Sequence, residues 1–349
     1  MVDATGSWQL HDTADPEALE GKFERNRHLL PAFAADAPED EYLPELNEAK
    51  ALDRAQGCLL GLAVGEAIGS AVEYLPRDGF DEVTGPAGGG PLDITAGEWT
   101  DGMAMALCLA RTMIATGTVE QYDFMQRLQA WLTAGENTVH GKCVAIGDTT
   151  RTAIESFIET DEPSAGLQDP DSAGNGSLIR LAPLAILAAR HAEIARFLSS
   201  KQSRATHATH ECLDACELFT AQLVDALNGA DKAKALRPRV MQLAPNSLAI
   251  NGGEFKEKSR EDVRSSAYVI DTLDAALWAI WTTDTFDEAV LRAANLGGDA
   301  AGVAAVAGQL AGALYGFRSI PTEWRDCVAM GDDIKDLSAK LLTMSATAF

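Results

Sequence analysis

Two apolar segments of the chain carry a glycine at every fourth position. One spans residues 53–74 and the other residues 303–316. The glycines of the two stripes are Gly57, Gly61, Gly65 and Gly69, and then Gly308, Gly312 and Gly316. A spacing of four places residues on one face of a helix, and glycine on that face lets a second helix approach closely. We therefore expect two helices that pack on each other or on close neighbours.

Helical periodicity extends along much of the remaining chain. It predicts helices over 103–114, 124–132, 149–160, 178–198, 211–227 and 267–281, and one or two more over 323–345. The segments 77–97, 134–148, 161–174 and 228–266 have the composition of loops. Aromatic residues make up only 6% of the chain, and no segment alternates between apolar and polar residues as a strand would. The expected fold class is all-α.

The first fifty residues differ in composition from the rest of the chain. They contain twelve Asp or Glu and four Lys or Arg, a net charge of −8, and four prolines interrupt them. Residues 16–30 have the pattern of a short helix, and the remainder has the composition of a loop. We divide the chain into an acidic N-terminal extension, 1–50, and a main domain, 51–349. The extension fits three roles: a disordered tail, a strap across the main domain, or a docking arm for a partner.

The charge of the whole chain limits its partners. The formal net charge is −24 and the isoelectric point is about 4.5. Such a surface repels nucleic acid and anionic membranes, so we expect neither as a partner. It attracts a basic protein or simply confers solubility. The six cysteines are scattered, which is typical of the reducing cytoplasm, and we expect neither a secretory signal nor a membrane span.

Several acidic side chains lie in or beside the glycine-rich segments. Glu66 and Glu73 are seven residues apart on one face of the first striped helix. Thr100 and Asp101 precede the helix at 103–114, and Asp299 lies in the glycine loop that leads into the second striped helix. Such residues cap helices, but they are also the hard oxygen ligands that Mg²⁺ prefers. The pattern alone leaves both roles open.

Two polar motifs remain. Gly174-Asn175-Gly176-Ser177 precedes an apolar segment, and a turn of this kind presents backbone N–H groups that favour phosphate. A cluster of His and Cys at residues 207–216 has a spacing that matches no zinc motif, so we expect no zinc there. His207, next to Thr206, suits the lining of a polar pocket.

Taken together and in order, these segments resemble the ADP-ribosylglycohydrolase family. The matching stretches are 57–73, 98–101 with the helix after it, 174–183, 268–278 and 295–316. The resemblance implies a compact orthogonal bundle of helices. It also implies a cleft where two Mg²⁺ ions bind beside the ribose of an ADP-ribosyl group, and hydrolysis of the bond between that ribose and a protein side chain, often arginine.

The resemblance also assigns roles to individual residues. It implies Thr100, Asp101 and Asp299 as metal ligands, and Glu66, Asp101 and Asp299 as catalytic groups. The residues implied to contact the substrate are Glu73, Trp99, His140, Gly141, Asn175, Gly176 and Ser177.

This sequence departs from the family at both metal motifs. The first, Thr-Asp-Asp-Thr, reads Thr100-Asp101-Gly102-Met103 here, and the second, Asp-x-Asp-Thr, has Asp299 but then Ala301 and Gly302. Positions 102, 301 and 302 have no side-chain oxygen. We therefore expect one Mg²⁺ ion or none.

Two functions fit this combination. The first is a glycohydrolase with an impaired or single-metal site, acting on ADP-ribosylated protein. The second is a catalytically inactive binding protein that holds an ADP-ribosyl ligand. In that role it would alternatively use its N-terminal extension to block a partner, as an immunity protein against an ADP-ribosylating toxin does.

Overall fold

The structure is a computed structural model that describes residues 47–347, of which 47–238 and 242–347 belong to one compact unit. Within these residues the regular structure is helical, and only three isolated β-bridges occur. The prediction of an all-α fold is confirmed. The expectations for a helix at 16–30 and for the role of the acidic extension lie outside the described residues, apart from 47–50.

Two helices form the centre of the fold, α2 (Glu48–Gly69) and α13 (Ala300–Tyr315). They are the two glycine-striped segments, and they pack on each other as predicted. A Cβ atom added to Gly61 would lie 2.2 Å from the carbonyl oxygen of Gly308, and one on Gly312 would lie 1.9 Å from that of Gly57. The two backbones therefore touch directly, and only glycine permits this approach at the crossing.

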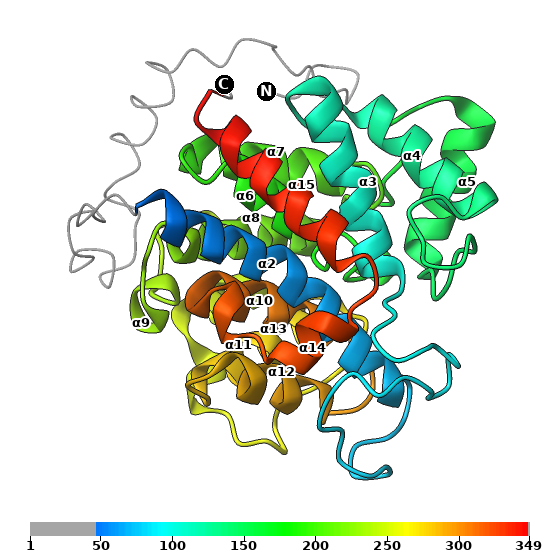
Figure 1. Cartoon of the computed structure of the whole chain (residues 1–349). Helices are drawn as coiled ribbons and strands as arrows, with labels where there is room; N and C mark the ends of the chain where they lie inside the picture. Colours follow the sequence, from blue (N-terminus) through cyan, green and yellow to red (C-terminus); the bar gives the residue numbers. More distant parts are fainter. Residues whose placement is uncertain (1–46, 348–349) are drawn as a thin grey trace. The chain divides into compact units, whose positions relative to one another are not determined.

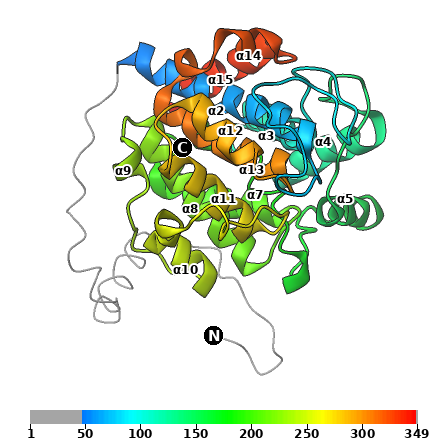
Figure 2. The ribbon, with the colours of Figure 1, turned by 90° about the horizontal axis from the view of Figure 1, so that it is seen from below.

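The other helices surround this pair (Figure 1). In chain order they are α3 (Asp101–Thr116), α4 (Gln121–Ala134), α5 (Asp148–Thr160), α6 (Ala182–Leu187), α7 (Ala192–Arg204), α8 (His210–Leu227), α9 (Lys232–Ala235), α10 (Pro245–Gly252), α11 (Val269–Trp281), α12 (Phe286–Ala294), α14 (Thr322–Cys327) and α15 (Gly331–Ser345). Short 3₁₀ turns occur at Ser70–Val72, Pro170–Ser172, Glu254–Glu257 and Phe317–Ser319. Helices α11 and α12 pack along α13, and α15 packs along α2 (Figures 1 and 2).

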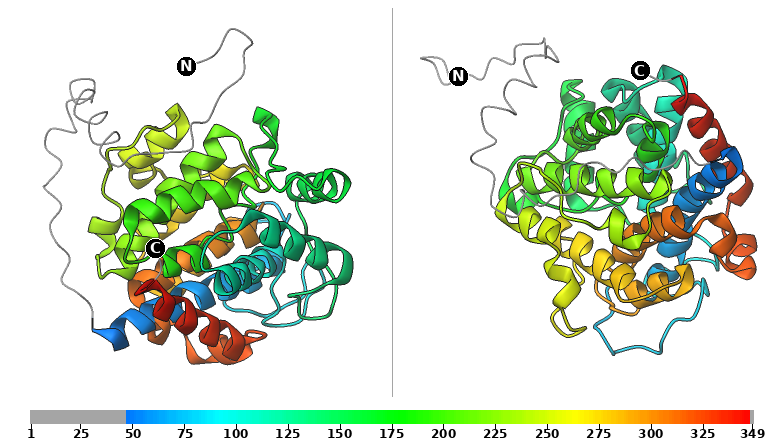
Figure 3. Two further views of the ribbon diagram at one scale, coloured as in Figure 1. Left: turned by 90° about the horizontal axis from the view of Figure 1, so that it is seen from above. Right: turned by 90° about the vertical axis from the view of Figure 1, so that its left-hand side faces the viewer.

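The single apolar helix predicted over 178–198 is wrong. The chain instead forms α6 and α7, separated by a turn at residues 188–191. Pro183 marks the first turn of α6. After the helix ends, the side-chain amide of Asn228 donates to the carbonyl of Ala189 at 2.6 Å, so a long-range hydrogen bond replaces one that a continuous helix would make. Helix α7 then lies beside α8 (Figure 3).

The prediction of a loop throughout 228–266 is also wrong, because α9 and α10 lie within it. The boundaries of α10 carry recognisable sequence signals. Pro245 occupies its first turn, and Gly253 ends it in the left-handed conformation with φ of 92°. The helix is short and only weakly amphipathic, which explains why periodicity alone missed it.

One helical segment, Glu48–Val72, is long and apolar enough to cross a membrane by length and composition. Most of it, 89% of the window concerned, is buried inside the protein. Its apolar character is therefore accounted for by its position at the centre of the core.

Candidate functional site

Four acidic side chains converge where α2 ends and where α3 and α13 begin. Glu66 lies in the last turn of α2, Glu73 follows it, Asp101 is the first residue of α3, and Asp299 is the N-cap of α13. Burial, together with the charges of Glu66 and Asp299, raises the pKa of Asp101 well above its usual range. Side chains far apart in the sequence thus share one cluster, in which Glu66 contacts the start of α3 and Glu73 the start of α13.

Within the described residues, the carboxylate of Glu66 forms all of its hydrogen bonds with residues at the start of α3. Its carboxylate accepts hydrogen bonds from the Thr100 hydroxyl at 2.8 Å and from the N–H groups of Gly102 and Met103 at 2.7 and 2.8 Å. The side chain is 1% exposed, and burial raises its pKa. Glu66 therefore acts as a capping carboxylate supplied by another helix, which satisfies donors that α3 leaves unpaired.

Glu73 performs a similar task at α13, because it accepts from the N–H of Ala301 at 2.7 Å. It also shares a hydrogen bond with the carboxyl group of Asp299. Burial and the charge of Asp299 raise the pKa of Glu73 to about 9. Burial raises the pKa of Asp299 as well, so the pair favours one shared proton over two ionised carboxylates at neutral pH.

The Gly174–Ser177 turn reaches this cluster through Asn175. Its amide nitrogen donates to Asp299 at 2.6 Å and lies 2.8 Å from the hydroxyl of Thr272 on α11. Its carbonyl accepts from the N–H groups of Leu178 and Ile179, so the turn continues as one helical turn before α6. The turn is thus held rigidly against α11 and α13.

The residues present do not fit the Mg²⁺ site that the family resemblance implies. A Cβ atom at Gly102 would lie 2.8 Å from an oxygen of Glu66, and one at Gly302 would lie 2.2 Å from an oxygen of Asp299. The carboxylates thus fill the space where ligands from these positions would lie. Within 47–347 no group of three or more His, Cys, Asp or Glu side chains is arranged to hold a metal ion. Instead, the carboxylates of Glu66 and Asp299 accept hydrogen bonds from protein groups.

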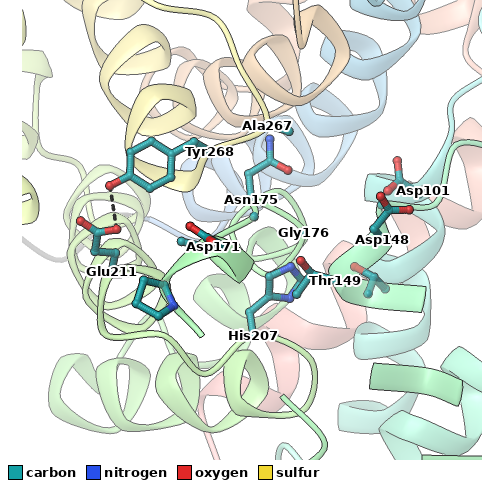
Figure 4. Close-up of a pocket in the computed structure, with 15 residues that line it drawn as sticks. Asp101, Asp148, Thr149, Asp171, Asn175, Gly176, His207, Glu211, Ala267 and Tyr268 are labelled. Atoms are coloured by element: carbon teal, nitrogen blue, oxygen red, sulfur yellow. Dashed lines mark hydrogen bonds between the residues drawn. The ribbon is translucent and has the colours of Figure 1, made fainter. Parts of the chain in front are cut away.

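A pocket of about 700 Å³ opens beside the cluster (Figure 4). Of the four clustered carboxyl groups, only Asp101 lines it. The complete lining is Asp101, Gly147, Asp148, Thr149, Thr150, Pro170, Asp171, Ala173, Gly174, Asn175, Gly176, His207, Glu211, Ala267 and Tyr268. These residues include four acids and no lysine or arginine. A ligand that carries negative charge must therefore be held here by neutral donors.

His207 is the one imidazole in the lining. Its ring lies beneath the glycine turn and beside Thr149 (Figure 4). The side chain is 1% exposed, and its Nδ1 lies 2.7 Å from the hydroxyl of Thr206. Burial, aided by the charge of Arg180, lowers the pKa of His207 to about 3, so the ring is neutral at physiological pH. In the sequence, the neighbouring Thr206 was the one indication that His207 lines a polar pocket.

Like Glu73, four other residues that the resemblance linked to the substrate lie outside the lining of this pocket. Trp99 is 3% exposed and donates its Nε1–H to Ala329, which gives it a structural contact. His140 lies 3.2 Å from Glu98, and its side chain is 61% exposed. Gly141 borders a separate hollow with Lys142 and Cys143, and the hydroxyl of Ser177 is buried.

Gly176 offers a direct test of the pocket. A Cβ atom there would lie 2.7 Å from the hydroxyl oxygen of Thr150 and 2.9 Å from the His207 ring. We expect Gly176→Ala to displace one of these groups and to weaken the binding of ADP-ribose at least about tenfold. We also expect the free energy of unfolding to fall by about 1–3 kcal/mol. Calorimetric titration and denaturant unfolding measure the two effects. Binding unchanged from the original chain would show that the pocket lies elsewhere.

Comparison with known proteins places the chain among its relatives. The ADP-ribosylglycohydrolase family model matches residues 47–348. An ADP-ribosylarginine hydrolase Tri1 of Pseudomonas putida is 48% identical over 85% of this chain and 80% of its own length. The ADP-ribosyl-[dinitrogen reductase] glycohydrolase of Rhodospirillum rubrum is 33% identical over 78% and 89% of the two chains.

A solved structure described as an ADP-ribosylglycohydrolase-related protein complex is also similar. It has a TM-score of 0.76 and 38% identity, and the match covers 85% of this chain and 99% of that one. Because the family model spans residues 47–348 and these relatives exceed 30% identity over most of their length, the chain belongs to the ADP-ribosylglycohydrolase family.

Proposed function

We propose that this protein binds the ADP-ribosyl group of ADP-ribosylated arginine in the 700 Å³ pocket, without a divalent metal and without hydrolysing the bond. The observation that carries the proposal is the set of neutral donors at the pocket. Besides the His207 ring, this set includes the N–H group of Gly176, which has no hydrogen-bond partner within the described residues. Donors of this kind suit phosphate and ribose oxygens. Arginine as the modified residue follows from the names of the relatives.

The four carboxyl groups of the cluster do not provide the pair that hydrolysis would require of them. Cleavage of a glycosidic bond by carboxyl groups alone requires two of them to flank the bond, one ionised and one protonated. Glu66 and Glu73 are 1% and 4% exposed and are bonded to helix N–H groups. Asp299 is held by Asn175, which leaves Asp101 as the single group of the cluster that faces the pocket.

Hydrolysis of the same bond is the competing function. It is favoured by the two relatives named ADP-ribosylarginine hydrolase, at 48% and 44% identity, the second of them from Serratia proteamaculans. In that case Asp101, Asp299 or Glu66 would act as the catalytic group. Mg²⁺, if required, would be held by Thr100, Asp101 and Asp299 alone.

A single experiment separates the two functions. A peptide ADP-ribosylated on arginine is incubated with the protein, once with Mg²⁺ and once with EDTA. We expect the protein to bind the modified peptide and not the unmodified one. We also expect no release of ADP-ribose above the buffer blank, with Mg²⁺ or with EDTA. Release that grows with time and with protein concentration would establish the hydrolase instead.

A protein partner for the acidic extension, such as an ADP-ribosylating toxin, stays a prediction because residues 1–46 lie outside the described residues. The proposal for the pocket does not depend on it.

A further inference from the structure

Arg180 is a charged side chain buried in the core without a carboxylate partner. It is 0% exposed, and no ion pair involves it within the described residues. Its guanidinium donates to the side-chain and backbone oxygens of Gln202 at 2.7 and 3.0 Å and to the hydroxyl of Thr206 at 2.9 Å. It also lies over the Phe124 ring, 4.9 Å from the centroid. A buried charge without an opposite charge is costly unless its hydrogen bonds are satisfied, and Arg180 meets this condition through neutral acceptors.

The hydroxyl of Thr206 connects Arg180 to His207 through two hydrogen bonds. Guanidinium groups only donate, so Thr206 must accept from Arg180. Its own hydrogen then needs an acceptor, and the one that the described contacts provide is Nδ1 of His207, at 2.7 Å. Thr206 is fully buried, so no solvent competes for this hydrogen.

The position of the proton on His207 is a consequence of this arrangement. Since Nδ1 accepts from Thr206, a neutral ring must carry its one hydrogen on Nε2. Nε2 has no hydrogen-bond partner within the described residues, and the ring lines the pocket. His207 is 99% buried. Its Nε2–H group is therefore an unpaired donor that faces the pocket.

The backbone around His207 keeps this geometry in place. Its N–H donates to Ser203 at 2.7 Å, and the Ser203 hydroxyl lies 2.8 Å from the carbonyl of His207. An isolated bridge to Leu167 fixes the next residues, since the N–H of Ala208 donates to Leu167 at 2.9 Å. The backbone position of His207 is thus fixed, and the burial of the ring, which is 1% exposed, disfavours a rotation that would turn Nδ1 toward the pocket.

We propose that Arg180 and Thr206 are positioning residues that fix the proton of His207 on Nε2, so that the pocket recognises an acceptor oxygen of its ligand. The inference rests on the proposed function, for which the acceptor is a ribose or phosphate oxygen of the ADP-ribosyl group. It explains how a pocket lined by four acids and no basic residue selects a ligand that carries phosphate. A protonated Nδ1 would instead turn an acceptor nitrogen toward that ligand.

The proton position can be measured without any ligand. The protein is labelled with ¹⁵N-histidine, and long-range ¹H–¹⁵N correlations are recorded for its six histidines, with a His207→Gln variant to assign the signal. We expect the Nε2–H tautomer for His207 down to at least about pH 5, since burial holds its pKa at about 3. An Nδ1–H tautomer, or an imidazolium at neutral pH, overturns the proposal whether or not ADP-ribose binds.

Variants of Thr206 then connect the tautomer to binding. Thr206→Val keeps the shape but removes the hydroxyl, and we expect a mixture of tautomers and an affinity for ADP-ribose weakened about tenfold. Thr206→Ser restores the hydroxyl, and we expect the original tautomer and an affinity within about twofold of the original. A matched control is Thr220→Val, since the Thr220 hydroxyl is also buried but has no hydrogen-bond partner among residues 47–347.

The outcomes separate this inference from the proposed function. If the original chain shows the Nε2–H tautomer but does not bind ADP-ribose, the proposed function fails and the assignment of Thr206 as a positioning residue for a ligand fails with it. If ADP-ribose binds equally well to Thr206→Val, or if Thr220→Val weakens binding as much, the positioning role is wrong while the proposed function stands.

Discussion

Gly61→Ala is expected to lower the free energy of unfolding by about 3 kcal/mol or more, because the new methyl group would meet backbone rather than a movable side chain. The Cβ atom would lie 2.2 Å from the Gly308 carbonyl oxygen and 2.9 Å from its carbon. Neither α2 nor α13 can yield locally, since contacts between them continue along both helices. Denaturant unfolding measures the change.

The chain provides a matched control for this substitution. Gly252 is also helical, but a Cβ atom there would meet nothing within 4 Å. Gly252→Ala should be neutral or stabilise the protein by up to about 1 kcal/mol through helix propensity. If Gly61→Ala costs less than about 1 kcal/mol, a range typical of ordinary substitutions, the close packing of the two helices is not what stabilises the centre of the fold.

Rebuilding the metal ligands should give the protein a response to Mg²⁺ that the original chain lacks. In the triple variant Gly102→Asp, Ala301→Asp and Gly302→Thr, the new side chains displace the terminal oxygens of Glu66 and Asp299, which are 2.8 and 2.2 Å from the two added Cβ positions at 102 and 302. We expect the variant to be less stable than the original without metal. Mg²⁺ at about one hundred times its dissociation constant should then restore about 2.7 kcal/mol by mass action.

An uncharged variant of similar shape controls for volume: Gly102→Asn, Ala301→Asn and Gly302→Val. It should be destabilised in the same way but should not respond to Mg²⁺, because it lacks the carboxylates that bind a hard cation. Thermal unfolding with and without Mg²⁺ compares the three proteins. An equal rise in melting temperature for the original chain and the rebuilt variant would show that Thr100, Asp101 and Asp299 already hold the ion.

Much of the fold could be predicted because its central contact is encoded locally. A glycine at every fourth position is visible in the sequence. That this spacing places the glycines on one face of a helix follows from helix geometry alone. The break between α6 and α7 is different. The turn is held by Asn228, 39 residues beyond Ala189, and no periodicity within 178–198 reports such a contact.

In the candidate site, too, the local features could be predicted and the long-range contacts could not. Glu66, Asp101 and Asp299 could be selected because acids beside glycine-rich helix ends are unusual, and the structure does bring them into one cluster. What could not be predicted is how their hydrogen bonds are used. Whether Glu66 faces a ligand or caps α3 depends on the approach of two helices, and that approach places its carboxylate where a side chain at position 102 would lie. His207 reaches the pocket through the bridge to Leu167, which no spacing indicates.

The most direct test of the central claim is calorimetric titration of the full chain with ADP-ribose in EDTA and again in Mg²⁺. We predict binding in both conditions with the same dissociation constant, because neutral donors rather than a dication hold the ligand. Binding that appears or strengthens only with Mg²⁺ would contradict the metal-free site. The absence of binding in both conditions would contradict the assignment of the pocket to an ADP-ribosyl group.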